Sequence, residues 1–200
     1  MQYTNRLEEK WGKLKPEGHC LLNGQMPFVS TKARLNMLFL PEDQTVLSER
    51  ISKICDCTMP EQLKAFYSQY NGCRLFFSSL NVFGVQAHPA EVYEPFDLSI
   101  ENNHILGNLS PGERKSCNVV FFASIGGEYV FGFDKVNPSR VYGYKKGSLV
   151  CVQEFPDFDS FFDFHFNRLI DEYDDACRKK HPLKQYIGIP VLEHLTTTIE

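Results

Sequence analysis

TMPEQLKAFYSQYNGCRLFFSSLNVFG, residues Thr58–Gly84, is the stretch that decides the fold of this chain. Thr58 and Glu61 have capping-box spacing, and Pro60 falls in the first turn, where a missing amide hydrogen costs nothing. Apolar residues then recur with a helical period, at Leu63, Phe66, Tyr67 and Tyr70. Asn71-Gly72 tolerates the left-handed conformation that ends helices. The stretch therefore predicts a short capped helix followed by an aromatic strand.

This stretch resembles the signature of the SUKH superfamily, which is named for Smi/Knr-type yeast cell-wall regulators and is best populated by bacterial toxin-immunity proteins. The resemblance continues in the right order through Val119–Asp134 (VVFFASIGGEYVFGFD), Val141–Val152 (VYGYKKGSLVCV) and Phe155–Leu169 (FPDFDSFFDFHFNRL). Met59 stands where the family usually has leucine, and roughly the first forty residues have no counterpart in it.

The elements expected along the chain make an α+β fold, in which about five to six strands of an antiparallel-rich sheet pack against helices. The expected domain organisation is an N-terminal extension over 1–40, a single SUKH-like domain over 41–180, and a tail over 181–200 that packs on the domain. The glycine pair Gly126-Gly127 predicts a tight hairpin turn with positive φ values.

Further elements are expected outside the segments that resemble the SUKH superfamily. Residues 3–14 suggest an amphipathic helix carrying Leu7 and Trp11, and Ala33–Leu40 fits either a strand or a buried helical turn. Pro41 opens a second helix. The remaining expectations are a loop over Lys15–Ser30 and an irregular segment between Asn81 and Cys117.

The closing helix, expected from about Asp157 to Lys180, has two different sides. At 100° per residue an apolar stripe contains Phe158, Phe162, His165, Phe166, Leu169, Tyr173 and Cys177. The opposite side carries the acids Asp163, Asp171, Asp174 and Asp175, with Phe164 among them. These acids either keep a solvent-facing side polar or form a docking face for a basic partner, with Phe164 as an anchor. The hairpin tyrosines Tyr142 and Tyr144 offer a second candidate surface.

Composition narrows the class of protein. The chain has 200 residues, a formal net charge of −4 and 42% hydrophobic residues, which is ample for a buried core. An acidic balance argues against general nucleic-acid binding. No apolar run approaches the roughly 20 residues that span a bilayer, and no signal-peptide core is present at the start. Seven scattered cysteines favour a reduced, cytoplasmic location.

Residue types that carry chemistry are present without the spacings that catalysis or metal binding needs. Cys55-x-Cys57, even with His19 and Cys20, lacks zinc-site spacing. His165 is interpreted as a satisfied core histidine, and His104 follows Glu101 without a visible nucleophile. Ser124 is not in a nucleophile elbow, and no phosphate-loop motif occurs. No catalytic, cofactor-binding or metal-binding residue is predicted.

The resemblance implies a non-enzymatic protein-binding domain that neutralises a cognate bacterial toxin of the nuclease or deaminase class. An acidic surface suits a basic toxin domain as the partner. The alternative is a regulatory scaffold of the Smi/Knr cell-wall type, and an enzyme is the interpretation that the sequence favours least.

Overall fold

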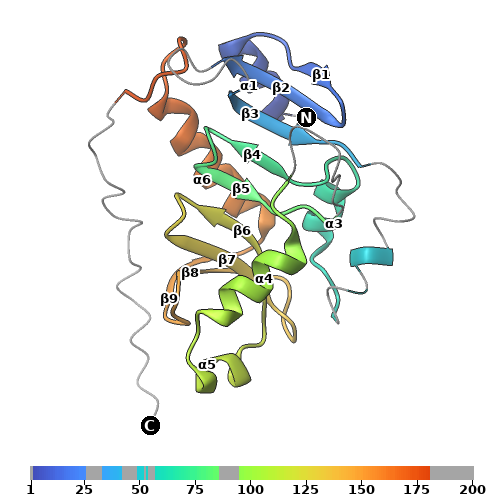
Figure 1. The fold of residues 1–200 in the computed structure, drawn as a ribbon, viewed down its shortest axis with the longest axis vertical. Coiled ribbons are helices and arrows are strands. Elements are labelled where there is room, and N and C mark those ends of the chain that lie inside the picture. Colours follow the sequence, from blue (N-terminus) through green and yellow to red (C-terminus); the bar gives the residue numbers. More distant parts are fainter. Residues whose placement is uncertain are drawn as a thin grey trace.

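The computed structural model describes residues 2–25, 33–41, 49–51, 53, 57–85 and 95–180. Within them a single antiparallel sheet has nine strands in sequential order, each paired with the next along the chain (Figure 1). The strands are β1 (Lys15–Glu17), β2 (Cys20–Gln25), β3 (Arg34–Phe39), β4 (Cys73–Leu75), β5 (Leu80–Val82), β6 (Val119–Ile125), β7 (Tyr129–Asp134), β8 (Val141–Lys145) and β9 (Cys151–Phe155). The helices are α1 (Gln2–Trp11), α3 (Glu61–Tyr67), α4 (Leu98–Gly107), α5 (Pro111–Ser116) and α6 (Phe158–Glu172).

The α+β class is confirmed, but the expected five to six strands are too few. The segment that resembles the SUKH superfamily supplies β4–β9, and the N-terminal residues add β1, β2 and β3 to the same sheet. The prediction of a loop from Lys15 is wrong, because β1 and β2 pair there around Gly18, whose φ is +58°. The ambiguous run Ala33–Leu40 contains strand β3.

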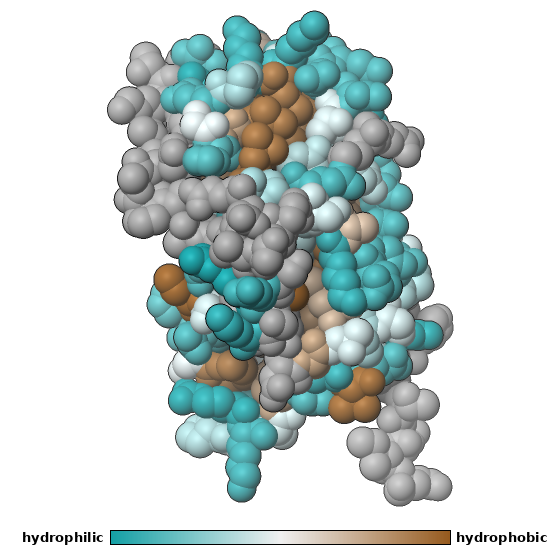
Figure 2. All heavy atoms as spheres, turned by 90° about the vertical axis from the view of Figure 1, so that its right-hand side faces the viewer, coloured by the Kyte–Doolittle hydropathy of each residue, from teal (hydrophilic) through white to brown (hydrophobic). Residues whose placement is uncertain are grey.

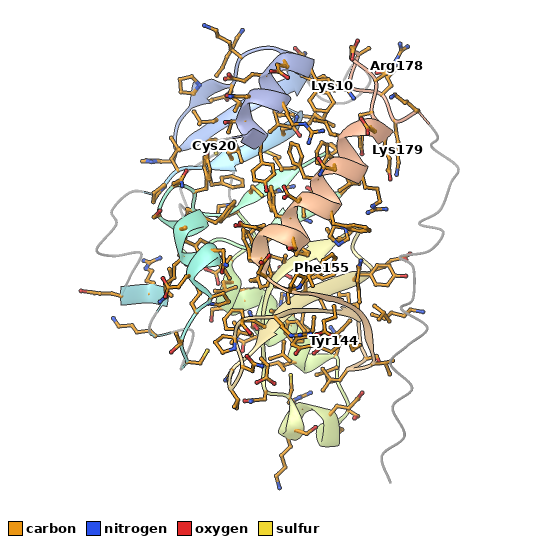
Figure 3. All side chains as sticks on the ribbon, turned by 180° about the vertical axis from the view of Figure 1, so that it is seen from behind. Lys10, Cys20, Tyr144, Phe155, Arg178 and Lys179 are labelled. Atoms are coloured by element: carbon orange, nitrogen blue, oxygen red, sulfur yellow. The ribbon has the colours of Figure 1, made fainter. Side chains whose placement is uncertain are left out.

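Helices cover both faces of the sheet (Figures 1 and 3). α1 and α6 lie on one face, and α4 lies on the other against β6. α4 is fastened there by Asn102, whose side chain donates to the Phe121 carbonyl at 2.6 Å and accepts from the Phe121 amide at 2.9 Å. On the face shown in Figure 2, hydrophobic residues form separate patches among hydrophilic ones. No helix among the described residues is long and apolar enough to cross a bilayer.

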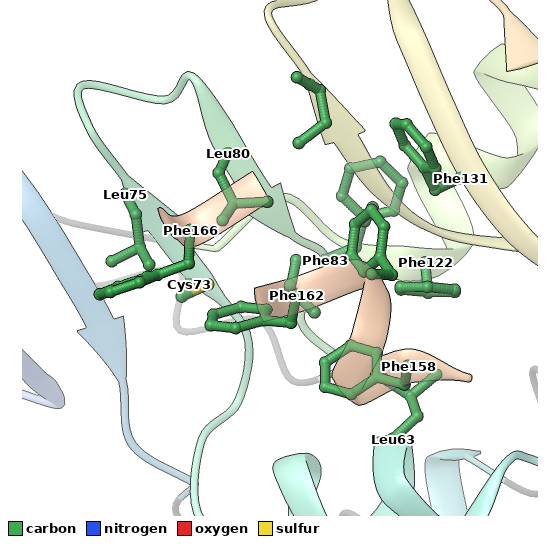
Figure 4. Packing of buried hydrophobic residues seen from close by; sticks show 14 of the residues in the cluster. Leu63, Cys73, Leu75, Leu80, Phe83, Phe122, Phe131, Phe158, Phe162 and Phe166 are labelled. Carbon is green, nitrogen blue, oxygen red and sulfur yellow. The ribbon is translucent and has the colours of Figure 1, made fainter. Parts of the chain in front are cut away.

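The core lies between α6 and the sheet. Phe158, Phe162 and Phe166 project from α6 toward aromatic and aliphatic side chains of the strands and α3 (Figure 4). Asp157 caps the helix by accepting from the Ser160 amide at 2.7 Å. The helix ends at Glu172, earlier than expected, and the predicted stripe residues beyond it remain buried in the turn that follows.

Helix ends show where local prediction succeeds and fails. The capping box expected at Thr58 is absent: Pro60 is the N-cap of α3 and makes no side-chain capping bond. A capping box does occur at Ser110 and Glu113, at the start of α5. The expectation of an irregular segment from Asn81 to Cys117 is therefore wrong for its second half, which contains α4 and α5.

Other local expectations are confirmed. Gly126 and Gly127 have φ values of +60° and +75° in the β6–β7 turn. On α3, Leu63 and Tyr67 are buried and Phe66 is half-buried, whereas Tyr70, expected on the same helical face, is half-buried after the helix has ended at Tyr67. The predicted helix after Pro41 falls largely outside the described residues, and the tail over 181–200 falls entirely outside them.

Candidate partner-binding site

The N-terminal helix α1 lies along α6 and covers part of its predicted acidic side. Leu7 is 1% exposed at this contact. The Trp11 indole donates to the Asp174 carbonyl at 2.9 Å, and the Lys10 ammonium donates to the Ile170 carbonyl at 2.5 Å. The Tyr3 hydroxyl donates to the Asp163 carboxylate. This side of α6 is therefore partly an intramolecular interface.

The four predicted acids consequently have different roles. Asp163 is exposed but accepts the Tyr3 hydrogen bond. Asp174 closes a turn by accepting from the Arg178 amide at 2.8 Å and from its guanidinium at 3.1 Å, and the amide bond contributes most to lowering the pKa of Asp174. Asp171 and Asp175 are exposed. Cations gather beside them at the C-terminal end of α6, where Figure 3 labels Lys10, Arg178 and Lys179.

Phe164 is 39% exposed, as its place among the acids predicted. Its ring packs against Phe155 with centroids 5.6 Å apart and meets His165 edge-on at 5.1 Å. Asp171 lies two helical turns further along the same side. The structure therefore presents a partly packed aromatic ring on the same side of α6 as an exposed carboxylate.

The two hairpin tyrosines lie on β8 and differ in exposure. Tyr142 is half-buried, and Tyr144 is only 8% exposed, with its ring edge-on to Phe121 at 5.8 Å. Burial raises the pKa of both hydroxyls. Tyr144 therefore offers a partner little surface.

His165 is buried, as expected, but it is not satisfied. It is 0% exposed among Phe131, Phe155 and Phe161, and neither ring nitrogen has a hydrogen-bond partner in the described part of the chain. Burial, together with a smaller contribution from the positive charge of Arg168, lowers the pKa of His165 to about 3. His165 is thus an uncharged member of the core.

A polar hollow on the α4 side of the sheet was not anticipated as a site. Its volume is about 460 Å³, and its walls include Asn81, Ser124, Glu101 and His104. The Asn81 amide nitrogen donates to the Ser78 carbonyl at 2.9 Å and to the Ser124 hydroxyl at 3.2 Å, whereas its buried oxygen has no partner among the described residues. Asn81 and Ser124 are cross-strand partners on β5 and β6.

The hollow can accept and donate hydrogen bonds, but its geometry does not form a catalytic pair. In the described residues neither Glu101 nor His104 hydrogen-bonds to Ser124, so the serine has no base in place to activate it. In the sequence, Glu101 and His104 are close together, whereas Ser124 lies 20 residues beyond His104. Only strand register places Ser124 opposite Asn81, and only packing brings α4 over them.

The cysteine and histidine group considered for zinc is not assembled in the part of the chain that the structure describes. No set of three possible ligands is found there. Cys20 is 1% exposed and packs with Leu22, Met37 and Phe39. Cys55 lies outside the described residues.

Comparison with known proteins identifies the family. The family model for the SMI1 / KNR4 family (SUKH-1) matches residues 46–167, which is more than half of the chain. The match includes β4–β9 and most of α6, and it begins after β3. No curated protein matches this chain. The SUKH resemblance of the sequence is thereby confirmed, and the chain belongs to the SMI1 / KNR4 family (SUKH-1).

Proposed function

We propose that this chain is a non-enzymatic, protein-binding domain that acts as an immunity protein. It binds a cognate bacterial toxin of the nuclease or deaminase class in the cytoplasm of the producing cell and occludes the toxin's active site. The observation that carries the proposal is membership in the SUKH-1 family. The net charge of −4 supports a basic toxin domain as the partner.

The contact surface that we propose is centred on Phe164. A large aromatic side chain that is exposed yet partly packed loses little conformational entropy on binding, which is typical of an interface anchor. Asp171, two helical turns further along α6, and Asp175, in the turn after the helix, supply exposed carboxylates. Asp163 and Asp174 have a structural role beside this surface, because their side chains accept hydrogen bonds from Tyr3 and Arg178. Tyr142 and Tyr144 lie outside this surface, because Tyr142 pairs with Glu154 and so points to the sheet face opposite Phe155, against which Phe164 packs.

The second candidate function is a regulatory scaffold of the Smi/Knr type. The description of the matched family, which names SMI1 and KNR4, favours it. Both functions require a protein partner. They differ in whether the partner is a toxin encoded beside this chain or a protein of cell-wall synthesis.

The test is co-expression with a candidate toxin domain drawn from the genes that flank this chain's gene. We expect the parent chain to protect cells and to form a stable complex with that domain. Phe164→Ala should speed dissociation of the complex by about tenfold or more, the effect typical of a central aromatic anchor. Phe77→Ala is the matched control, because Phe77 is also exposed, at 48%, but lies in the β4–β5 turn.

Two results would contradict the proposal. If the toxin domain neither binds nor is neutralised, while a cell-wall synthesis protein co-purifies in defined stoichiometry, the scaffold function is correct. If the toxin is neutralised and Phe164→Ala dissociates as slowly as the parent, the contact surface lies elsewhere on the molecule.

A further inference from the structure

A second surface, separate from Phe164, lies where α1, α3 and the first turns of α6 meet. It is a groove of about 240 Å³, hereafter the aromatic groove. Its walls are formed by Tyr3, Thr4, Leu7, Leu38, Gln62, Ala65, Phe66, Gln69, Tyr70, Leu75, Phe158, Asp159 and Phe162. Three of its rings, those of Tyr3, Phe66 and Tyr70, are only half-buried, so aromatic surface remains open to solvent.

The rings that line the groove pack against one another. The Phe66 centroid lies 5.6 Å from that of Tyr70, 5.4 Å from that of Phe158 and 5.9 Å from that of Phe162. The Tyr3 ring is edge-on to Phe162 at 4.8 Å, and its hydroxyl is held by Asp163. A preformed apolar recess of this kind binds a side chain without first paying to order its own walls.

The charge at the groove is negative. Asp159 is the one ionised side chain among the described residues that line it. Partial burial raises the pKa of Asp159, and repulsion from Asp157 and Asp163 raises it further. A cation placed beside Asp159 would relieve this repulsion, and the faces of the neighbouring aromatic rings also attract cations.

The size of the groove favours a side chain over a small molecule. Sites for small ligands usually enclose about 300–1,000 Å³, whereas anchors at protein interfaces fill smaller, well-packed recesses. The geometry points to one occupant: a segment of a protein partner that carries an apolar side chain next to a lysine or arginine. The apolar side chain enters the aromatic groove, and the cation lies against Asp159.

The nature of this partner rests on the proposed function, since a basic toxin domain offers many such segments. The preference of the groove for an apolar cation does not rest on the proposed function. The proposed function and the cation preference of the groove can therefore fail independently. The groove is accordingly tested with a small probe rather than with a toxin.

The probe is phenethylammonium, which joins a phenyl ring to a cation. Its matched neutral analogue is 2-phenylethanol. Binding of each to the full-length chain is measured from amide chemical shifts of Ala65, Gln69 and Asp159. We expect the shifts to map to the groove and the cation to bind about three- to fivefold more tightly than the alcohol, the range for a partly exposed ion pair.

Three variants test the assignment. Asp159→Asn keeps the shape of the side chain and should abolish the preference for the cation. Glu128→Gln removes an exposed charge from the β6–β7 turn, outside the groove, and should leave the preference unchanged. Ala65→Phe places a ring in the groove and should abolish binding of both probes, while the dispersion of the amide spectrum reports whether the fold is intact.

Several results would overturn the proposal. Equal binding of both probes, or an unchanged preference in Asp159→Asn, would show that the groove does not select cations. A dimer in sedimentation that Ala65→Phe converts to monomer would make a second copy of the chain the occupant. Probe affinity that rises about tenfold in the double variant Tyr186→Ser, Ile187→Ser would make the chain's own tail the occupant. If the chain neutralises the toxin but the groove shows no preference for the cation, the proposal for the groove is wrong and the proposed function stands.

Discussion

Phe162 and Phe164 are two residues apart on α6 and lie in opposite environments. Phe162 is 3% exposed and contacts the rings of Tyr3, Phe66 and Phe166, whereas Phe164 is 39% exposed. We expect Phe162→Ala to lower the free energy of unfolding by about 3–5 kcal/mol, because it leaves a cavity. Phe164→Ala, the matched control, should cost less than about 1.5 kcal/mol. Chemical denaturation measures both, and a loss below about 1 kcal/mol for Phe162→Ala would contradict its core position.

His165 predicts a dependence of stability on pH. Burial lowers its folded-state pKa to about 3, and Arg168 is the charged group that contributes to this shift. The unfolded chain, with an ordinary histidine pKa near 6.5, binds a proton below that pH that the folded chain does not bind. Stability contributed by His165 is therefore present above pH 6.5 and falls with pH toward 3, by up to about 1.4 kcal/mol per unit.

The measurement is the free energy of unfolding at pH 7 and at pH 5. His165→Leu should lose about 2 kcal/mol less than the parent over this interval, since the variant has no group to protonate. Equal losses in His165→Leu and the parent would show that the folded chain protonates His165 normally.

At the scale of elements, the segment that joins α3 to β4 packs tightly against the neighbouring backbone. The Asn71 amide donates to the Phe39 carbonyl at 2.7 Å, and the Asn71 side chain accepts from the Val85 amide at 2.8 Å. Gly72 follows with a φ of +87°, and a Cβ there would lie 2.6 Å from the Val82 carbonyl oxygen. The connection therefore has no room for a side chain and needs a conformation that other residues avoid.

We expect Gly72→Ala to lower the free energy of unfolding by at least about 2 kcal/mol, from left-handed strain together with the backbone clash. Gly112→Ala in α5 is the matched control. Nothing lies within 4 Å of a Cβ at that position, and alanine favours a helix, so stability should rise by up to about 1 kcal/mol. Equal effects of the two substitutions on thermal unfolding would argue against the tight connection.

At the scale of the whole molecule, the placement of charge governs the proposed association. Reversing Asp171 and Asp175 to lysine changes the formal net charge from −4 to zero. Association with a basic toxin domain should slow by about tenfold at low salt and become less sensitive to salt, because electrostatic steering is lost. Stopped-flow mixing at two ionic strengths measures both quantities.

The control for this experiment reverses two exposed acids that lie outside α6 and the turn after it: Glu17 in β1 and Glu128 in the β6–β7 turn. Net charge changes by the same amount, so a smaller effect would assign the steering to the surface near Phe164. If both pairs slow association equally, only net charge matters and that surface has no special role.

Local patterns predicted some elements well and missed others. The apolar stripe of α6 is confirmed because the aromatic residues at every fourth position, Phe158, Phe162 and Phe166, are buried in the same core. The start of α4 was missed although Asp97 caps it, because its apolar residues, including exposed Ile100 and buried Ile105, lie on more than one side. Strands β1 and β2 were missed because Pro16 and Gly18 resemble a loop until pairing with β3 is taken into account.

The sequence by itself determined the α+β class, the family, the β6–β7 turn and the buried stripe of α6, because period and turn chemistry act between residues close in the chain. Only the tertiary structure decided which acids of the predicted acidic side of α6 remain available to a partner. Tyr3 and Asp163 are 160 positions apart, and no local pattern relates them. Likewise the aromatic groove exists only because α1, α3 and α6 meet. Its walls come from these helices and from strands β3 and β4, and their mutual packing, rather than the periodicity of any one element, determines which rings stay exposed.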